Sequence, residues 1–367
     1  MFKKKEINMY LSAQKIISRV VFLVVTVLIL VNSASAGVEI SDFFSDFTSS
    51  DVTVNSTQDF QGKAVFELDY AGKTVESHDV PLNVKSGQPL TKVIIWQNKP
   101  LYDYYTAKVG IYRDNILLAS SSYQVSYGTV SLPGFHVVDF SPTNSGVQLL
   151  LRPFNPSAAD IKIELLDNND IIYSKSDDDV SLITNIEIDT TWPFLLTTNK
   201  DYIVRAKIFT HRLYSPPLVN TYIAYFKATK DVEILSDDVQ VDEYGASVTI
   251  RGKSQVAFDG FIVVKATSRT TNVTQVYRQQ VQDILVSGKE DTAGVVWKGL
   301  APGAYDVEIL AVDKENVTID KYETAVRIPE YSNVSGSSAA KSTPGFEAIF
   351  LILMLLFVSR RREAAYV

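Results

Sequence analysis

The sequence predicts an all-β protein built from three tandem β-sandwich domains. The first observation is a regular spacing of the chain's only three tryptophans: Trp96, Trp192 and Trp297. Each is followed eight to ten residues later by a tyrosine: Tyr105, Tyr202 and Tyr305. Each tyrosine opens a run with apolar residues at every second position, which is typical of a strand with one buried face. Helical periodicity, by contrast, is nearly absent.

A third landmark repeats with a similar period. The tripeptides Phe44-Ser45-Asp46, Phe140-Ser141-Pro142 and Leu235-Ser236-Asp237 lie 96 and 95 residues apart. Three landmarks with one period predict three repeated units, 37–130, 131–229 and 230–329. The tryptophans and the three tyrosines would then occupy equivalent core positions. Units of this size can each bury a core without disulfides.

Within each unit, short apolar runs alternate with turn signals. In the second unit, 161–165 leads into Asp167-Asn168-Asn169-Asp170 and returns through 171–173. Asparagine tolerates positive φ, so we expect a tight hairpin there. The one stretch with some helical periodicity is 276–285, in the extra length of the third unit.

The segment Leu300-Ala301-Pro302-Gly303-Ala304-Tyr305 resembles the tyrosine corner of fibronectin type III and immunoglobulin-like sandwiches. In those families the tyrosine hydroxyl hydrogen-bonds a nearby backbone group and fixes the turn between strands. The resemblance implies immunoglobulin-like domains. Tyr105 and Tyr202 lack the Leu-x-Pro-Gly lead-in, so the family label rests chiefly on the third unit.

The first 36 residues read as an N-terminal signal helix that is removed on export. Five basic residues precede a twelve-residue run, 20–31, that is apolar except for Thr26. Ala34-Ser35-Ala36 follows, a small-x-small pattern of the secretory type, so we expect cleavage after Ala36. The alternative is an uncleaved membrane helix, but this run is too short to span a bilayer.

The other end of the chain carries a spacer and a three-part signal. Residues 330–343 are rich in Ser, Asn, Gly and Ala, which is typical of a flexible spacer. Residues 344–367 contain Pro344-Gly345-Phe346, an 11-residue apolar run, and then Arg360, Arg361 and Arg362. The run predicts a short apolar helix, below the ~20 residues that a membrane span needs. The arginines would lie on the cytoplasmic side.

This arrangement resembles the PGF sorting signal of archaeal surface proteins. The resemblance implies that an archaeosortase-like enzyme removes the tail near Phe346 and that the mature protein gains a lipid anchor. The implied partners are that enzyme, the export machinery, and the membrane, reached through the C-terminus or the lipid. The protein would then lie on the extracellular face of the cell membrane.

The composition limits both the chemistry and the partners that the chain can have. The chain has no cysteine, which excludes disulfides and thiol chemistry. Its formal charge is −7, and its two ends carry eight basic and three acidic residues, so the 37–345 body carries −12. An acidic body argues against nucleic acid as a partner and against docking on anionic lipid. The alternative is that this negative charge only keeps the protein soluble.

Catalytic motifs are not found in the sequence. His78, His136 and His211 are scattered and too few for a transition-metal site with three or four converging ligands. Gly-x-Ser-x-Gly turns and glycine-rich phosphate loops are absent. Paired carboxylates for glycoside hydrolysis remain open, because such pairs meet only in the fold. We therefore expect no enzymatic activity and no cofactor.

Asp177, Asp178 and Asp179 are the candidate metal ligands, with Asp167 and Asp170 close by in the chain. Clustered carboxylates attract Ca²⁺, which takes six to eight oxygen ligands. The alternative, which we favour, is a solvated loop between strands, because the sequence has no Asp-x-Asp-x-Asp-Gly loop.

Aromatic groups and glycosylation sequons are the remaining candidate sites. Three aromatic groups stand out: Phe43, Phe44 and Phe47; Tyr102, Tyr104 and Tyr105; and Tyr222, Tyr225 and Phe226. Tyrosine suits recognition, although ordinary burial would place most of these residues in cores. The Asn-x-Ser/Thr sequons make four glycosylation candidates: Asn55, Asn272, Asn316 and Asn333.

These observations favour a non-enzymatic, C-terminally anchored surface protein with a structural or adhesive role and an unknown envelope or extracellular partner. Sandwich strands hold loops at both ends, and those loops supply binding variety. The alternative is a surface binding module for a soluble sugar or peptide, and a surface hydrolase comes third. A concave pocket lined by aromatics would favour the binding module, and a convergent carboxylate pair would favour the hydrolase.

Overall fold

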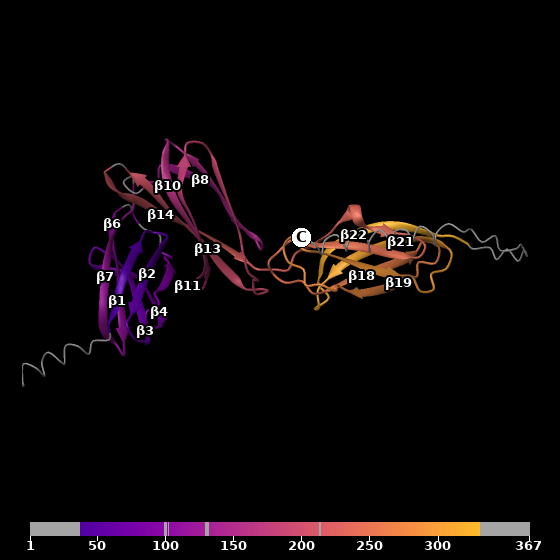
Figure 1. Cartoon of the computed structure of the whole chain (residues 1–367), viewed down its shortest axis with the longest axis horizontal. Coiled ribbons are helices and arrows are strands. Elements are labelled where there is room, and N and C mark those ends of the chain that lie inside the picture. The colour runs from indigo at the N-terminus through magenta and orange to yellow at the C-terminus, as the bar shows by residue number, and fades with distance from the viewer. Residues whose placement is uncertain (1–36, 99–100, 102, 129–131, 213, 331–367) are drawn as a thin grey trace, which may run out of the picture.

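The computed structural model describes residues 37–98, 101, 103–128, 132–212 and 214–330 of the 367-residue chain. The predicted signal helix, Ala36, the sorting signal and Asn333 lie outside the described residues. Figure 1 shows an elongated body in which the first two sandwiches lie side by side and the third lies at the far end. None of the helices in the described part is long and apolar enough to cross a membrane.

The first sandwich has seven strands. In chain order these are β1 Val38–Ser45, β2 Ser49–Ser56, β3 Phe60–Tyr70, β4 Lys73–Val84, β5 Leu90–Ile95, β6 Tyr104–Arg113 and β7 Ile116–Ser126. Strands β1, β2 and β5 form one layer, and β4-β3-β6-β7 form the other. Alternate residues of β3 and β6, such as Phe66 and Val109, fill the space between the layers, as the period of two predicts.

The second sandwich repeats this plan. Its strands are β8 Phe135–Pro142, β9 Gly146–Pro153, β10 Ser157–Asp167, β11 Asp170–Leu182, β12 Ile186–Thr191, β13 Asp201–Arg212 and β14 Ser215–Lys227. Strands β12-β9-β8 face β11-β10-β13-β14. The predicted hairpin is confirmed, because β10 and β11 pair through a turn in which Asn168 has a φ of 55°.

The third sandwich adds two short elements to the same plan. Its elements are β15 Val232–Ile234, the 3₁₀ turn η2 Ser236–Asp238, β16 Gln240–Val241, β17 Gly245–Gly252, β18 Phe261–Ser268, β19 Thr274–Gln280, β20 Glu290–Val296, β21 Gly303–Val312 and β22 Thr318–Ile328. The helical expectation for 276–285 is wrong, because β19 pairs with β18 along its whole length. Its Val276 and Tyr277 are residues that favour strands.

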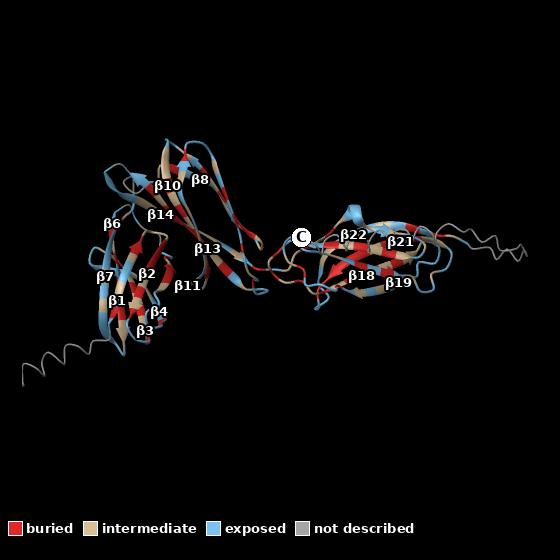
Figure 2. Ribbon diagram, viewed as in Figure 1, coloured by how far each residue is buried: buried red, intermediate tan, exposed pale blue. Residues whose placement is uncertain are grey.

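Each sandwich contains the same arrangement of strands. The first, second and fifth main strands form one layer, and the fourth, third, sixth and seventh form the other in that order. Buried residues concentrate between the layers in all three (Figure 2). Each tryptophan directly follows the fifth main strand. Its backbone N–H donates to the carbonyl oxygen of the residue just before the second main strand, at 3.0–3.1 Å, with acceptors Thr48, Ser145 and Tyr244.

The three tyrosines also occupy matching places in their sandwiches. The Tyr305 hydroxyl donates to the carbonyl oxygen of Ala301 at 2.8 Å. The hydroxyls of Tyr105 and Tyr202 accept hydrogen bonds from backbone N–H groups four and five residues upstream, at 2.9 and 3.1 Å. A tyrosine corner therefore forms in every sandwich, including the two without the Leu-x-Pro-Gly lead-in.

The first two sandwiches share a continuous sheet. Strand β11 pairs with β5, which joins the layers into the seven-stranded order β1-β2-β5-β11-β10-β13-β14. At this edge, the backbone N–H of Val93 donates to the carbonyl oxygen of Asn169 at 3.0 Å, and Nδ2 of Asn169 donates back to the Val93 oxygen at 2.8 Å. The hairpin predicted from Asn168 and Asn169 thus also holds two domains together.

The second and third sandwiches meet through a buried loop. Val256 lies between β17 and β18 of the third sandwich, yet its side chain belongs to the core of the second and is 1% exposed. Leu196 N–H donates to the Gln255 oxygen, and Gln255 N–H donates to the Asn144 oxygen, both at 2.9 Å. This joint is therefore formed by core packing and backbone pairing.

Candidate functional site

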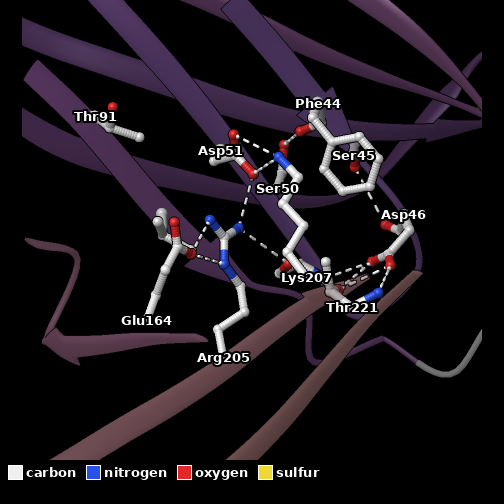
Figure 3. Close-up of polar contacts among 12 residues, drawn as sticks. Phe44, Ser45, Asp46, Ser50, Asp51, Thr91, Glu164, Arg205, Lys207 and Thr221 are labelled. Atoms are coloured by element: carbon white, nitrogen blue, oxygen red, sulfur yellow. Dashed lines mark hydrogen bonds and ion pairs between the residues drawn. The ribbon is translucent and has the colours of Figure 1, made fainter. Parts of the chain in front are cut away.

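The interface between the first two sandwiches contains a group of buried charges (Figure 3). Arg205, on β13, points away from the core of its own sandwich and is only 1% exposed. Its Nη1 donates to Oδ2 of Asp51 at 2.7 Å, and its Nε donates to Oε2 of Glu164 at 2.7 Å. Because Asp51 lies on β2, the guanidinium links the two domains.

Two lysines complete this ion-pair group. Lys207, two residues further along β13, donates from Nζ to both carboxylate oxygens of Asp51, at 2.9 and 3.2 Å. The same Nζ lies 4.1 Å from the centroid of the Phe44 ring, a cation–π distance. Lys162 Nζ lies 2.8 Å from Oε1 of Glu164. Both carboxylates therefore have two cationic partners.

The electrostatics of the group favour its charged form. Burial lowers the pKa of Arg205, but the charges of Asp51 and Glu164 outweigh burial and hold that pKa above its ordinary value. A buried ion pair is often no more stabilising than well-packed apolar residues, whereas removal of one partner is costly. The group joins β2 of the first sandwich to β10 and β13 of the second, and loss of one partner would leave a buried charge uncompensated.

A second polar contact lies beside the ion pairs. Asp46 lies in the turn after β1. Its carboxylate accepts hydrogen bonds from the backbone N–H of Thr221 on β14, at 2.6 Å, and from the Thr221 hydroxyl, at 2.8 Å. It also accepts the backbone N–H groups of Thr48 and Ser49 within its own turn. Burial nevertheless raises the pKa of Asp46, because these bonds only partly compensate for lost hydration.

A cavity of about 350 Å³ opens next to this contact. Three parts of the chain line it: the turn 44–48, the end of β7 with the residues after it, and the first half of β14. Its aromatic lining comprises Phe44, Phe47, Tyr123, Tyr127 and Tyr222. Its size falls within the usual range for small-ligand sites.

The described lining has one carboxylate, that of Asp46, and no lysine or arginine. Asp46 is already bonded to Thr221 and its own turn. Burial, and then the charge of Asp46, raise the pKa of Tyr222 to about 12, so its hydroxyl stays protonated at neutral pH. Apart from the Asp46 carboxylate, the described lining thus offers aromatic surface and neutral hydrogen-bonding groups.

The candidate calcium ligands lie on strand β11, not in a loop between strands. Asp177 pairs with Lys175 at 3.2 Å, Asp179 lies 3.7 Å from His211, and Asp178 is exposed. A register shift in the β10–β11 ladder accompanies the φ of 56° at Asp179. Successive strand residues point to opposite faces. Within the described ranges, no three His, Cys, Asp or Glu side chains converge as metal ligands.

The histidines lie on three separate strands. His78, on β4, pairs with Glu76 at 2.6 Å, and His211, on β13, pairs with Asp160 at 3.1 Å. His136, on the edge strand β8, is exposed. The structure does not bring them together.

Three of the four sequons lie within the described residues. Asn272 and Asn316 occupy exposed hairpin turns with φ values of 57° and 64°. Asn55 lies within strand β2 and is half-buried. The two turns are therefore more accessible than the strand.

The structure brings together parts of two predicted aromatic groups and adds residues that sequence reasoning missed. Phe44 and Phe47 meet Tyr222 at the cavity, while Tyr105 packs in the first core and Tyr225 is exposed. Missed residues are the cavity tyrosines and the ion-pair group: Tyr123, Tyr127, Asp51, Lys162, Glu164, Arg205 and Lys207. Tyr123 and Tyr127 carry no sequence signal, and the other five are marked only by a charged side chain within a strand.

Comparison with known proteins gives no family. No protein-family model matches the chain, and no curated protein matches it. Among solved structures, a tetra-tandem repeat from the extending region of a large adhesion protein is 13% identical, with a TM-score of 0.24, and covers 79% of this chain and 74% of that one. Native α2-macroglobulin of E. coli is 9% identical, with a TM-score of 0.22, and covers 84% of this chain.

The chain spans only 23% of the length of that macroglobulin. Salmonella α2-macroglobulin reacted with methylamine is also 9% identical, with a TM-score of 0.22, and is matched over 22% of its length. Likenesses this distant do not bear on what the chain does.

Proposed function

We propose that this protein is a non-enzymatic cell-surface stalk with a structural or adhesive role. The observation that carries the proposal is the construction of its two joints. Buried ion pairs and a shared sheet hold the first, and the packing of Val256 holds the second. Domains joined by flexible linkers are expected to move independently, whereas a stalk that bears load or presents a face needs fixed joints.

The surface location is part of the same proposal. It is supported by the apolar and small-residue pattern of 1–36 and by the order of elements in 344–367. On this proposal, the protein is exported, and an archaeosortase-like enzyme replaces the tail with a lipid. The spacer at 330–343 would hold the sandwiches away from the membrane.

Mass spectrometry of the native protein from a membrane fraction tests this location. The expected mature N-terminus is Gly37, with the chain ending near Phe346 and bearing a lipid. Retention of Met1 together with Tyr366-Val367 would show that neither end is processed and would contradict the export and anchoring proposal.

The absence of catalysis is also a proposal. It is supported by the engagement of the carboxylates at the first joint, where Asp51 and Glu164 are in ion pairs. The described cavity lining includes only one carboxylate, whereas glycoside hydrolysis ordinarily uses two.

A second candidate function is binding of a soluble ligand, and the aromatic-lined cavity specifically favours it. A neutral sugar or a short uncharged peptide suits aromatic faces with hydroxyl and amide groups better than an anion does, because the described lining has no basic side chain. Calorimetric titration with neutral oligosaccharides and peptides tests this candidate. Binding that Tyr123→Ala leaves unchanged would exclude the cavity as the site.

A further inference from the structure

Strand β7 forms an exposed edge of the first sandwich (Figure 2). Ile116 and Leu117 are 65% and 50% exposed, and Leu118 and Tyr123 are also exposed. Strand β1 lies near it in the other layer, where the rings of Phe44 and Tyr123 are 5.5 Å apart. Among the described strands, however, β7 forms a ladder only with β6. Its other backbone edge pairs with no strand of the part of the chain that the structure describes.

The sequence of β7 distinguishes it from the other edge strands. Proteins usually protect such edges with charged side chains, prolines or very short strands. Every other described edge strand longer than two residues carries a charge or a proline: β1, β4, β8, β12, β14, β15, β19, β20 and β22. The eleven residues of β7 include neither. A long unprotected edge is a template for pairing with another strand.

The sequence of β7 is also self-complementary. In an antiparallel pairing centred on Ser121, Leu117 lies opposite Val125 of the second copy, and Ala119 lies opposite Tyr123. On this face Leu117 thus meets Val125, a large ring meets a small side chain, and serines form the centre, whereas on the other face Ile116 and Leu118 lie opposite Ser126 and Gln124. Directly opposed side chains of this kind stabilise antiparallel pairs, and a two-fold contact requires self-complementarity.

We propose that two copies of this chain pair antiparallel through β7, in register about Ser121. The two four-stranded layers then form one eight-stranded sheet across a two-fold axis. A second copy is the favoured occupant because its strand brings no charge that would have to be dehydrated against an uncharged edge. The pairing goes beyond the proposed function, since it depends on neither export nor the anchor.

The absence of cysteine from the natural chain makes a position-specific test direct. The full chain with Ser121→Cys is purified in detergent and mildly oxidised, and dimer is measured on a non-reducing gel. Opposed residues have Cβ atoms about 4.5–5.5 Å apart, near the spacing of a disulfide. In the same register, two Ile116→Cys residues lie about 34 Å apart, given about 3.4 Å per strand residue. We expect at least tenfold more cross-linked dimer for Ser121→Cys than for Ile116→Cys.

Equal cross-linking at the two positions, or none at Ser121, would overturn the proposal. A second variant separates pairing from folding. Ser120 is exposed and lies opposite Gly110 of β6, on the outer face of the sheet. Ser120→Lys should therefore make the chain monomeric in sedimentation experiments while leaving its urea unfolding midpoint unchanged. The matched control is Ala325→Lys, at an exposed position of edge strand β22, which should leave the dimer intact. A wild-type chain that stays monomeric would also contradict the pairing.

Discussion

Replacement of Arg205 by alanine is expected to destabilise the body of the protein by about 3 kcal/mol. The change leaves two nearly fully buried carboxylates without their shared guanidinium. We expect the lower end of the range for broken buried pairs, because Lys207 and Lys162 still contact Asp51 and Glu164. Urea unfolding of the 37–330 fragment, followed by tryptophan fluorescence, measures the loss.

The matched control is Arg251→Ala in the third sandwich. Arg251 donates from Nε to Glu290 at 2.7 Å, but the two side chains are 45% and 43% exposed. Exposed pairs contribute roughly 0–1 kcal/mol, so this variant should unfold almost like the wild type. If both variants lose the same small amount of unfolding free energy, breaking the buried ion pairs costs no more than breaking an exposed pair, which contradicts this prediction.

Replacement of Trp192 by alanine is expected to cost about 3–5 kcal/mol, the range for an aromatic residue removed from a packed core. Its indole is 1% exposed, stacks on Phe226 and contacts the edge of Tyr173. Its Nε1 also donates to the carbonyl oxygen of Thr143 at 3.0 Å. Truncation leaves a cavity and an unpaired acceptor. Calorimetric unfolding of the same fragment measures the cost.

Trp297→Ala is the comparison for this prediction. Trp297 occupies the equivalent place in the third sandwich but is only partly buried. Its loss should therefore cost less than that of Trp192. A larger cost at Trp297 would mean that burial at this repeated position does not control domain stability.

The fold could be predicted because its signals are local. The period of two after Tyr105, Tyr202 and Tyr305 identifies which face of each sixth main strand is buried. The tyrosine corner depends on a hydroxyl and a backbone group only four or five residues apart. The helical expectation for 276–285 failed because a short apolar pattern is ambiguous and the partner strand β18 decides it.

The candidate site could not be predicted in the same way, because its residues come from distant parts of the chain. Arg205 and Asp51 are 154 positions apart. In the run after Tyr202, the period of two places Arg205 and Lys207 on the face away from the core, which is correct for their own sandwich. The first sandwich covers that face, and no pattern within β13 shows this. The cavity likewise combines Phe44, Tyr123 and Tyr222 from separate elements.

The central claim is that the first two sandwiches move as one body, and pulsed dipolar spectroscopy tests it most directly. The chain has no cysteine, so spin labels attach only at Asn83→Cys and Ser181→Cys, exposed positions on β4 and β11. A rigid joint predicts a single narrow distance distribution between the labels. A broad distribution in the otherwise wild-type chain would show independent domain motion and contradict the account.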